Sequence, residues 1–296
     1  MEPGSRPANK PLFTESNMRL ARVTKDGNIG LAALASGKVT IAYGDDIADL
    51  DAHIAAGTLA QAGAKAGAGE AVDEASLTFL SPLVRPSKII CLGLNYRDHA
   101  EEAGLGIPEF PVLFARFPSS LIGHGAPIIL PKVSSQLDWE AELVAVLSKG
   151  GKNIAEADAL DHVAGYSAFN DGSIRDYQMR TPQWTAGKNF DDTGAFGPWL
   201  VTPDELPAGA AGLKIECRVN GQVMQNSNTD KLIFNVARTI SLLSTFMTLE
   251  AGDVLVMGTP GGIGLARNPP IFMKAGDVCE VEIEGIGVLR NPIVAE

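Results

Sequence analysis

Two glutamates lie two positions apart in the segment DWEAELVAVL, whose other residues have the composition of a buried strand. Because side chains on a strand alternate between its two faces, Glu140 and Glu142 point to the same side. The pair is open to a plain interpretation as the solvated face of a half-exposed strand. However, Val144 and Val146 continue the same face, and ionised carboxylates beside apolar side chains are costly unless they are paired or bind a cation. The pattern is therefore a candidate cation site.

A third carboxylate follows in the segment AGYSAFNDGSIRDYQ, where Asp171 ends an apolar, strand-like run. Asp171 could instead belong to an ordinary Asp-Gly turn. Three carboxylates with no conveniently placed His or Cys favour a hard ion, Mg²⁺ or else Mn²⁺ or Ca²⁺, over zinc or copper. Such a site would leave coordination positions open for water and substrate.

Two further segments carry groups that could take part in catalysis. His99 and Glu102 in GLNYRDHAEEAG are three residues apart, so one helical turn would let the carboxylate orient the imidazole to deprotonate water. A surface turn with a lone histidine is the alternative. Lys188 in WTAGKNFDD has apolar neighbours, although a solvated loop lysine would have the same sequence.

The elements that must position these residues are mainly strands. Apolar segments bounded by Gly and Pro predict strands in KIICLGL, PVLFARF, APIILP, WEAELVAVL, LKIECRVNG, DVLVMG and DVCEVEIEGIGVLRNP. Two segments predict helices, NIAEADALDHVAG and TDKLIFNVARTISLLSTFM, the second with Asn228 or Thr229 as its cap. Because strands and helices do not alternate regularly, we expect an α+β, mainly β fold and not a doubly wound parallel sheet.

The chain divides into three parts by composition. Residues 1–17 predict a flexible leader without the apolar core of a signal peptide, and residues 18–83 predict a small β-rich module with DG and SG turns followed by an Ala-rich stretch. Residues 84–296 predict the catalytic domain. No apolar run is long enough to span a membrane, so we expect a cytoplasmic protein.

Composition and missing motifs exclude several classes of function. A net charge of -11 argues against nucleic acid or an anionic membrane as partner. The segment GTPGGIG lacks the spacing of a dinucleotide-binding loop, and the signatures of a phosphate-binding loop and of a serine nucleophile elbow are absent from the sequence. Cys91, Cys217 and Cys279 lie far apart in apolar segments, which indicates reduced core residues.

Seven ordered segments resemble the fumarylacetoacetate hydrolase family. They are GLNYRDHAEE, PVLFARFPSSLIGHGAPIILP, LDWEAELVAVLSKGGKNI, GYSAFNDGSIRDYQ, WTAGKNFDDTGAFGPWLV, VNGQVMQNSNTDKLIFNV and TLEAGDVLVMGTPGGIG. The resemblance covers residues 84–296, and the N-terminal module is similar to that of longer members. It implies a catalytic core that is a mixed β-sandwich or β-roll, a homodimer, and a member close to the acylpyruvases and fumarylpyruvate hydrolases.

The resemblance also assigns roles to individual residues. The implied metal ligands are Glu140, Glu142 and Asp171. The implied catalytic residues are His99, Glu102 and Lys188, the first two on a mobile lid. The implied substrate contacts are Arg116, Arg175, Gln178 and Thr259. Arg116 departs from the family, in which a lysine is frequent here, and its fork-shaped guanidinium puts the usual substrate contact in doubt.

The predicted activity is Mg²⁺-dependent hydrolysis of a carbon–carbon bond in an acylpyruvate or related β-diketo acid, with a place in aromatic catabolism. His99 with Glu102 would activate the water, and the metal and Lys188 would stabilise the pyruvate-like enolate that leaves. A decarboxylase, a lyase or an enol–keto isomerase would use the same enolate, and a non-catalytic metal-stabilised binding protein is a further alternative. The expected partner is a small anionic keto acid. Two tryptophans near Lys188, Trp184 and Trp199, hint at an aromatic or bulky apolar substrate, although Trp is usually a core residue.

Overall fold

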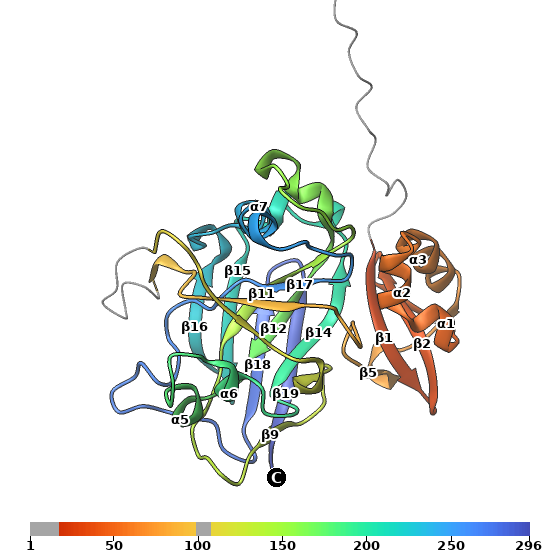
Figure 1. The fold of residues 1–296 in the computed structure, drawn as a ribbon. Helices are drawn as coiled ribbons and strands as arrows, with labels where there is room; N and C mark the ends of the chain where they lie inside the picture. Colours follow the sequence, from red (N-terminus) through yellow and green to blue (C-terminus); the bar gives the residue numbers. More distant parts are fainter. Residues whose placement is uncertain (1–17, 99–107) are drawn as a thin grey trace, which may run out of the picture.

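The computed structural model describes residues 18–98 and 108–296, in which strands dominate (Figure 1). The strands are β1 (Arg19–Lys25), β2 (Asn28–Ala35), β3 (Lys38–Tyr43), β4 (Glu70–Ala71), β5 (Thr78–Phe79), β6 (Ile89–Gly93), β7 (Val112–Ala115), β8 (Leu121–Ile122), β9 (Ile128–Leu130), β10 (Leu137–Asp138), β11 (Ala141–Leu147), β12 (Val163–Asp171), β13 (Ser173–Ile174), β14 (Gly194–Val201), β15 (Lys214–Val219), β16 (Gln222–Asn228), β17 (Val254–Val256), β18 (Val278–Ile283) and β19 (Gly287–Ala295). Every segment predicted to be a strand contains one.

Helices are short and few in the described residues. The α-helices are α1 (Asp45–Ala48), α2 (Leu50–Ala55), α3 (Leu59–Gly67), α5 (Arg175–Gln178), α6 (Thr185–Lys188) and α7 (Val236–Phe246). The 3-10 helices are η1 (Glu74–Ser76), η2 (Pro118–Ser120), η3 (Glu156–His162), η4 (Pro203–Glu205), η5 (Ala208–Ala210) and η6 (Thr229–Lys231). None of these helices has the length and apolarity that a membrane crossing requires.

Two large sheets organise the described residues. A 12-stranded sheet has the order β4-β3-β2-β1-β14-β12-β11-β17-β6-β7, with β5 beside β1 and β8 beside β14. A five-stranded sheet has the order β16-β15-β18-β19-β9, and β10 pairs with β13. Most neighbours are antiparallel, but β17 runs parallel to β6, and β19 runs parallel to β9. The expected mainly β, α+β fold with mixed sheets is confirmed.

Strand β11 is buried on both faces because it lies between two hydrophobic clusters. Leu143, Ala145 and Leu147 belong to the larger cluster, whereas Val144 and Val146 belong to the second one. The predicted alternation is therefore confirmed, and the face that carries the glutamates continues into apolar packing. The three cysteines are also buried and unbridged, as predicted.

Strands β1, β2 and β3 form an antiparallel meander at the N-terminal end of the described chain. Asp26 and Gly27, and likewise Ser36 and Gly37, have positive φ angles, which matches the predicted DG and SG hairpin turns. Helices α1 to α3 follow β3 and pack beside this meander (Figure 1). Because Arg19 of β1 pairs with Val201 of β14, the meander extends the large sheet. The boundaries at residues 17 and 83 stay predictions.

Both predicted helices differ from the observed ones. The segment NIAEADALDHVAG forms only η3, because β12 begins at Val163 and pairs with β11. In the second segment Asn228 caps the short η6, while α7 begins later, with Asn235 accepting a hydrogen bond from Arg238 N. The prediction of Asn228 or Thr229 as the cap of the long helix was therefore wrong.

Candidate active site

The three candidate metal ligands come from two paired strands. Asp171 ends β12, and its backbone N–H donates to the carbonyl oxygen of Glu140, just before β11, at 2.9 Å. Ala141 pairs with Asn170 and Glu142 with Phe169, so the sheet places the three carboxylates on one face. All three residues are buried. The sheet register thus brings Asp171 next to two glutamates that precede it in sequence by 31 and 29 positions.

Three cations surround these carboxylates. Lys188 Nζ lies 2.5 Å from both Glu140 Oε2 and Asp171 Oδ2. Arg175 Nη2 lies 2.7 Å from Glu140 Oε1, and Arg116 Nη1 pairs with the other oxygen of Asp171. Lys188 reaches this position because α6 packs closely on α5: a Cβ at Gly187 would lie 2.5 Å from the backbone of Gln178.

The charges shift the ionisation of the cluster in opposite directions. Burial raises the pKa of Glu140, but Lys188 and Arg175 outweigh burial and lower it to about 2. Burial, reinforced by Asp171 and Glu140, raises the pKa of Glu142 well above its usual value. Burial lowers the pKa of Lys188, yet the two facing carboxylates more than offset it and raise that pKa overall. Glu142 is thus the carboxylate whose ionisation the surroundings oppose most.

A divalent cation fits this donor set. One oxygen from each of Glu140, Glu142 and Asp171 lies within 4.8 Å of the others. Oxygen ligands of one Mg²⁺ or Ca²⁺ are separated by at most about 4 to 5 Å, given metal–oxygen distances of about 2.1 to 2.6 Å. A bound cation would also offset the cost of ionising Glu142. The group can therefore hold a hard divalent ion, as the residue types predicted.

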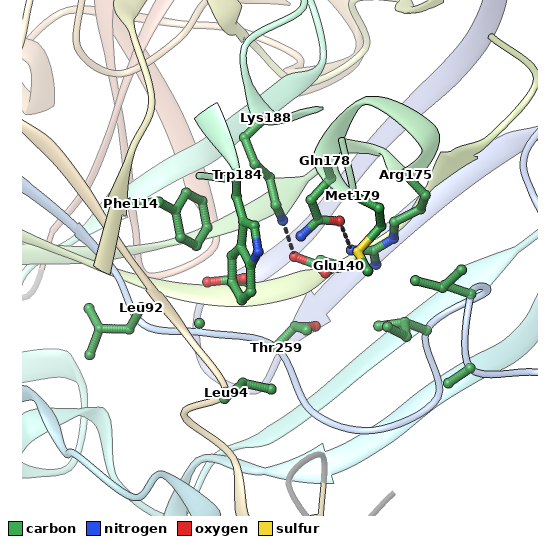
Figure 2. Close-up of a pocket in the computed structure, with 15 residues that line it drawn as sticks. Leu92, Leu94, Phe114, Glu140, Arg175, Gln178, Met179, Trp184, Lys188 and Thr259 are labelled. Atoms are coloured by element: carbon green, nitrogen blue, oxygen red, sulfur yellow. Dashed lines mark hydrogen bonds and ion pairs between the residues drawn. The ribbon is translucent and has the colours of Figure 1, made fainter. Parts of the chain in front are cut away.

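The remaining predicted site residues lie at different depths. Gln178 and Thr259 line the cavity in front of the carboxylates together with Arg175 (Figure 2). The Thr259 hydroxyl donates to the carbonyl of Ala141 at 3.0 Å and accepts from the amide of Gln225 at 2.8 Å. Thr259 therefore also fixes the start of β11, the strand that carries Glu142. His99 and Glu102 lie outside the described residues, so their predicted pairing stays a prediction.

Arg116 lies behind Asp171 and outside the cavity lining. Its guanidinium donates to Asp171, to the carbonyl of Gly172 at 3.2 Å and to Thr193 Oγ1 at 2.8 Å. Ser120 accepts from Nε at 3.2 Å. The substrate contact predicted for Arg116 stays untested, but the observed contacts are those of a residue that fixes the position of Asp171.

Sequence reasoning missed Asp138, which is fully buried beside the site. Its carboxylate accepts from Arg175 Nε at 2.8 Å and from the backbone N–H groups of Gly264 and Leu265 at 2.8 and 2.9 Å. The signal was present in the sequence, because Asp138 precedes Glu140 by two positions and so extends the same alternating pattern. The amide of Gln225, which binds Ala141 N at 2.9 Å, had no such signal.

The cavity has a volume of about 320 Å³ and two kinds of wall. The charged and polar lining consists of Glu140, Glu142, Arg175, Gln178, Lys188 and Thr259. The larger apolar lining side chains include Leu92, Leu94, Phe114, Met179, Trp184, Ile263 and Leu265. Trp184 therefore belongs to the site, whereas Trp199 is buried and packs edge-on against Phe79 at 5.3 Å.

The fold and this site define a mainly β protein whose paired strands present buried carboxylates for a divalent ion. The family described as fumarylacetoacetate (FAA) hydrolase, C-terminal, matches residues 88–294. The chain therefore belongs to the fumarylacetoacetate hydrolase family, an enzyme family whose members commonly bind a divalent metal and act on small organic acids.

Named relatives and solved structures agree with this assignment. The chain is 46% identical over 225 residues to the mitochondrial oxaloacetate tautomerase of Xenopus laevis, covering 75% of this chain and 70% of the relative. A fumarylacetoacetate hydrolase from Exiguobacterium antarcticum has a TM-score of 0.83 at 32% identity, with 94% of this chain and 100% of that one covered. A 5-carboxymethyl-2-hydroxymuconate delta-isomerase from Mycobacterium smegmatis has a TM-score of 0.75 at 31% identity, covering 94% and 99%.

Proposed function

We propose that the chain is a Mg²⁺-dependent enol–keto tautomerase of small 2-oxo acids. The observation that carries this proposal is the buried cluster of Lys188, Arg175 and three carboxylates at the cavity, which can stabilise an enolate. The name of the Xenopus relative supports the reaction type, and the isomerase from Mycobacterium smegmatis, as named, agrees with it. Tautomerisation was one of the alternatives that the sequence left open.

The chain's own residues supply binding and charge. Bound Mg²⁺ would act as a Lewis acid that lowers the energy of the substrate's enolate form. Gln178 uses its amide oxygen to accept from Arg175 Nη1 at 2.8 Å, so its amide NH₂ is the group that can donate to a substrate carboxylate. Lys188 carries a raised pKa and stays protonated, so its ammonium can stabilise negative charge on the enolate oxygen. The enol O–H proton leaves, C3 gains a proton, and no bond between heavy atoms breaks.

The test is a spectrophotometric assay of enol loss. Oxaloacetate enol, added to the Mg²⁺-loaded protein, should decay faster than with Mg²⁺ alone, and EDTA should remove the difference. Lys188→Met should lower kcat by about 100-fold or more, the scale measured for one preorganised donor. Circular dichroism of the Lys188→Met variant is the control that tests whether it is folded. Equal decay rates with and without folded, Mg²⁺-loaded protein would contradict the proposal.

Hydrolysis of acylpyruvates, the reaction first expected from the sequence, is the second candidate. The size of the cavity is compatible with this reaction. Its volume of about 320 Å³ is roughly ten times the volume per molecule in liquid water, about 30 Å³, so an acyl group has room. Chromatographic detection of pyruvate and a carboxylic acid from acetylpyruvate distinguishes it from tautomerisation. His99→Ala should abolish hydrolysis while leaving enol–keto exchange measurable.

Location and assembly belong to the same proposal. The sequence predicts a cytoplasmic homodimer, whereas the Xenopus relative is named as mitochondrial. Cell fractionation tests the location, and light scattering of the purified full chain tests the oligomeric state. A role in aromatic catabolism depends on the hydrolytic candidate.

A further inference from the structure

Phe114 and Trp184 form an aromatic wall of the cavity, on the side of Glu140 away from Arg175. Figure 2 shows Phe114 and Trp184 on one side of Glu140 and Arg175 on the other. Leu92 and Leu94 line the cavity below the aromatic pair (Figure 2). A substrate whose carboxylate accepts from the Gln178 amide, beside Arg175, would direct its remote group toward this aromatic wall.

The aromatic wall is held in place by its neighbours. The rings of Trp184 and Phe114 have centroids 5.4 Å apart and are tilted by 59°. The indole lies against Gly93 of β6, where a Cβ would be 2.3 Å from Trp184 Cζ3, so only glycine leaves room for it. Lys188 Nζ lies 5.0 Å from the centre of the Phe114 ring. The wall thus begins next to the group that stabilises the enolate.

Charge makes this wall a poor place for a second carboxylate. Among the described residues that line the cavity, the cations are Arg175 and Lys188. Arg175 lies on the other side of Glu140 from this wall (Figure 2), and Lys188 Nζ lies 2.5 Å from both Glu140 Oε2 and Asp171 Oδ2 and is the group assigned to the enolate oxygen. An anionic group placed against Trp184 and Phe114 would lose its hydration without gaining a partner, whereas an apolar group there would be favoured.

We propose that this site selects 2-oxo acids with an aryl or bulky alkyl group at C3, and that Trp184 and Phe114 are the residues that determine this specificity. The proposal rests on the proposed tautomerase function and names its substrate class. The proposed preference differs from that of a site for oxaloacetate, because the C3 substituent of oxaloacetate is a second carboxylate.

Two substrates that differ only in this substituent test the proposal. Phenylpyruvate and oxaloacetate share the 2-oxo acid core, and enol loss can be followed for both with the Mg²⁺-loaded full chain. We expect kcat/KM for phenylpyruvate to exceed that for oxaloacetate by about tenfold or more, the scale of discrimination by apolar pockets. Trp184→Ser should lower kcat/KM for phenylpyruvate by about 10 to 100-fold, mainly through KM, with a much smaller effect on oxaloacetate. Trp184→Phe should restore most of the preference.

A gain-of-function variant and a control complete the design. Leu94→Arg adds a cation at the apolar end and should raise kcat/KM for oxaloacetate while lowering it for phenylpyruvate; it also provides the test if Trp184→Ser does not fold. Gln178→Ala, on the carboxylate side, should lower kcat/KM for phenylpyruvate and for oxaloacetate by a similar factor. A wild-type preference for oxaloacetate, or a Trp184→Ser effect equal on both substrates, would overturn the specificity proposal but leave the tautomerase function standing. Loss of both activities in folded wild-type protein would instead overturn the function itself.

Discussion

Asp138 and Arg175 form a buried ion pair with 2.8 Å between Asp138 Oδ2 and Arg175 Nε. The same carboxylate binds the backbone N–H groups of Gly264 and Leu265, and Leu265 lines the cavity. One side chain therefore positions both Arg175, which lines the cavity, and a loop of the cavity wall.

Asp138→Asn should destabilise the protein and weaken substrate binding. The asparagine amide keeps the shape of the carboxylate but replaces one acceptor oxygen by an NH₂ donor, which would face the N–H donors of Arg175 or of the backbone. The substitution also removes the negative charge that pairs with Arg175. Breaking a buried ion pair costs about 3 to 5 kcal/mol. We expect a loss of this size in urea unfolding and a rise in KM that exceeds the fall in kcat. Asp204→Asn, at an exposed position, is the matched control, and equal stability of the two variants would refute this role.

Arg116→Lys tests whether Arg116 positions Asp171. A lysine ammonium cannot make the forked contacts to Asp171, Gly172 and Thr193 at once. Changes in groups that orient metal ligands typically cost 10 to 100-fold in metal affinity. Calorimetric titration with Mg²⁺ should show a weakening of about this size, with the sheet structure retained in circular dichroism. An unchanged affinity would assign Arg116 a packing role only.

Metal binding should release a proton from Glu142. Because its pKa is raised well above the usual value, a proton competes with the cation as pH falls, and the apparent Mg²⁺ affinity should drop. Titrations between about pH 5.5 and about pH 8, in buffers with different ionisation enthalpies, measure the released protons. Mg²⁺ at about 100 times its Kd should also stabilise the fold by about 2.7 kcal/mol. Proton release that is the same in Glu142→Gln would contradict this prediction.

His124 should make stability depend on pH. Burial, followed by the charge of Arg290, lowers the pKa of His124 below 6.5 in the folded state. The unfolded chain then binds the proton more readily, so stability is full above about pH 6.5 and declines as pH falls below it, by at most about 1.4 kcal/mol per pH unit. Thermal unfolding of His124→Asn should show a shallower decline than wild type. The same substitution at His162 is the control, and identical slopes for His124→Asn and wild type would rule the histidine out.

The strand that carries the glutamates was predictable because its alternation depends only on local geometry. Trp184 and Trp199 show the opposite case, although both lie close to Lys188 in sequence. Trp184 lines the cavity, whereas Trp199 packs on Phe79. Trp184 precedes helix α6, whereas Trp199 lies within β14, and the packing of these two elements decides which tryptophan reaches the cavity. Sequence could therefore suggest an aromatic substrate but not assign the residue.

The helix cap was mispredicted because tertiary contacts overrode a local signal. Asn228 and Asn235 are both good caps. Between them, Leu232 forms a bridge with Tyr96, and Phe234 N donates to the side chain of Asn95 at 2.8 Å. These contacts keep residues 232–234 outside the helix, which begins after Asn235. Residues 95 and 96 are distant in sequence, so the local pattern around Asn228 and Asn235 does not contain these contacts.

The origin of the site residues has a consequence for how such a protein can diversify. The carboxylates that could hold a metal ion come from β11, β12 and the residue just before β11, whereas Trp184 and Leu94 come from short connecting segments. Replacements in those segments can reshape the cavity without disturbing the sheet register. New substrates are therefore accessible by small surface-loop changes, while the reactive chemistry is inherited intact.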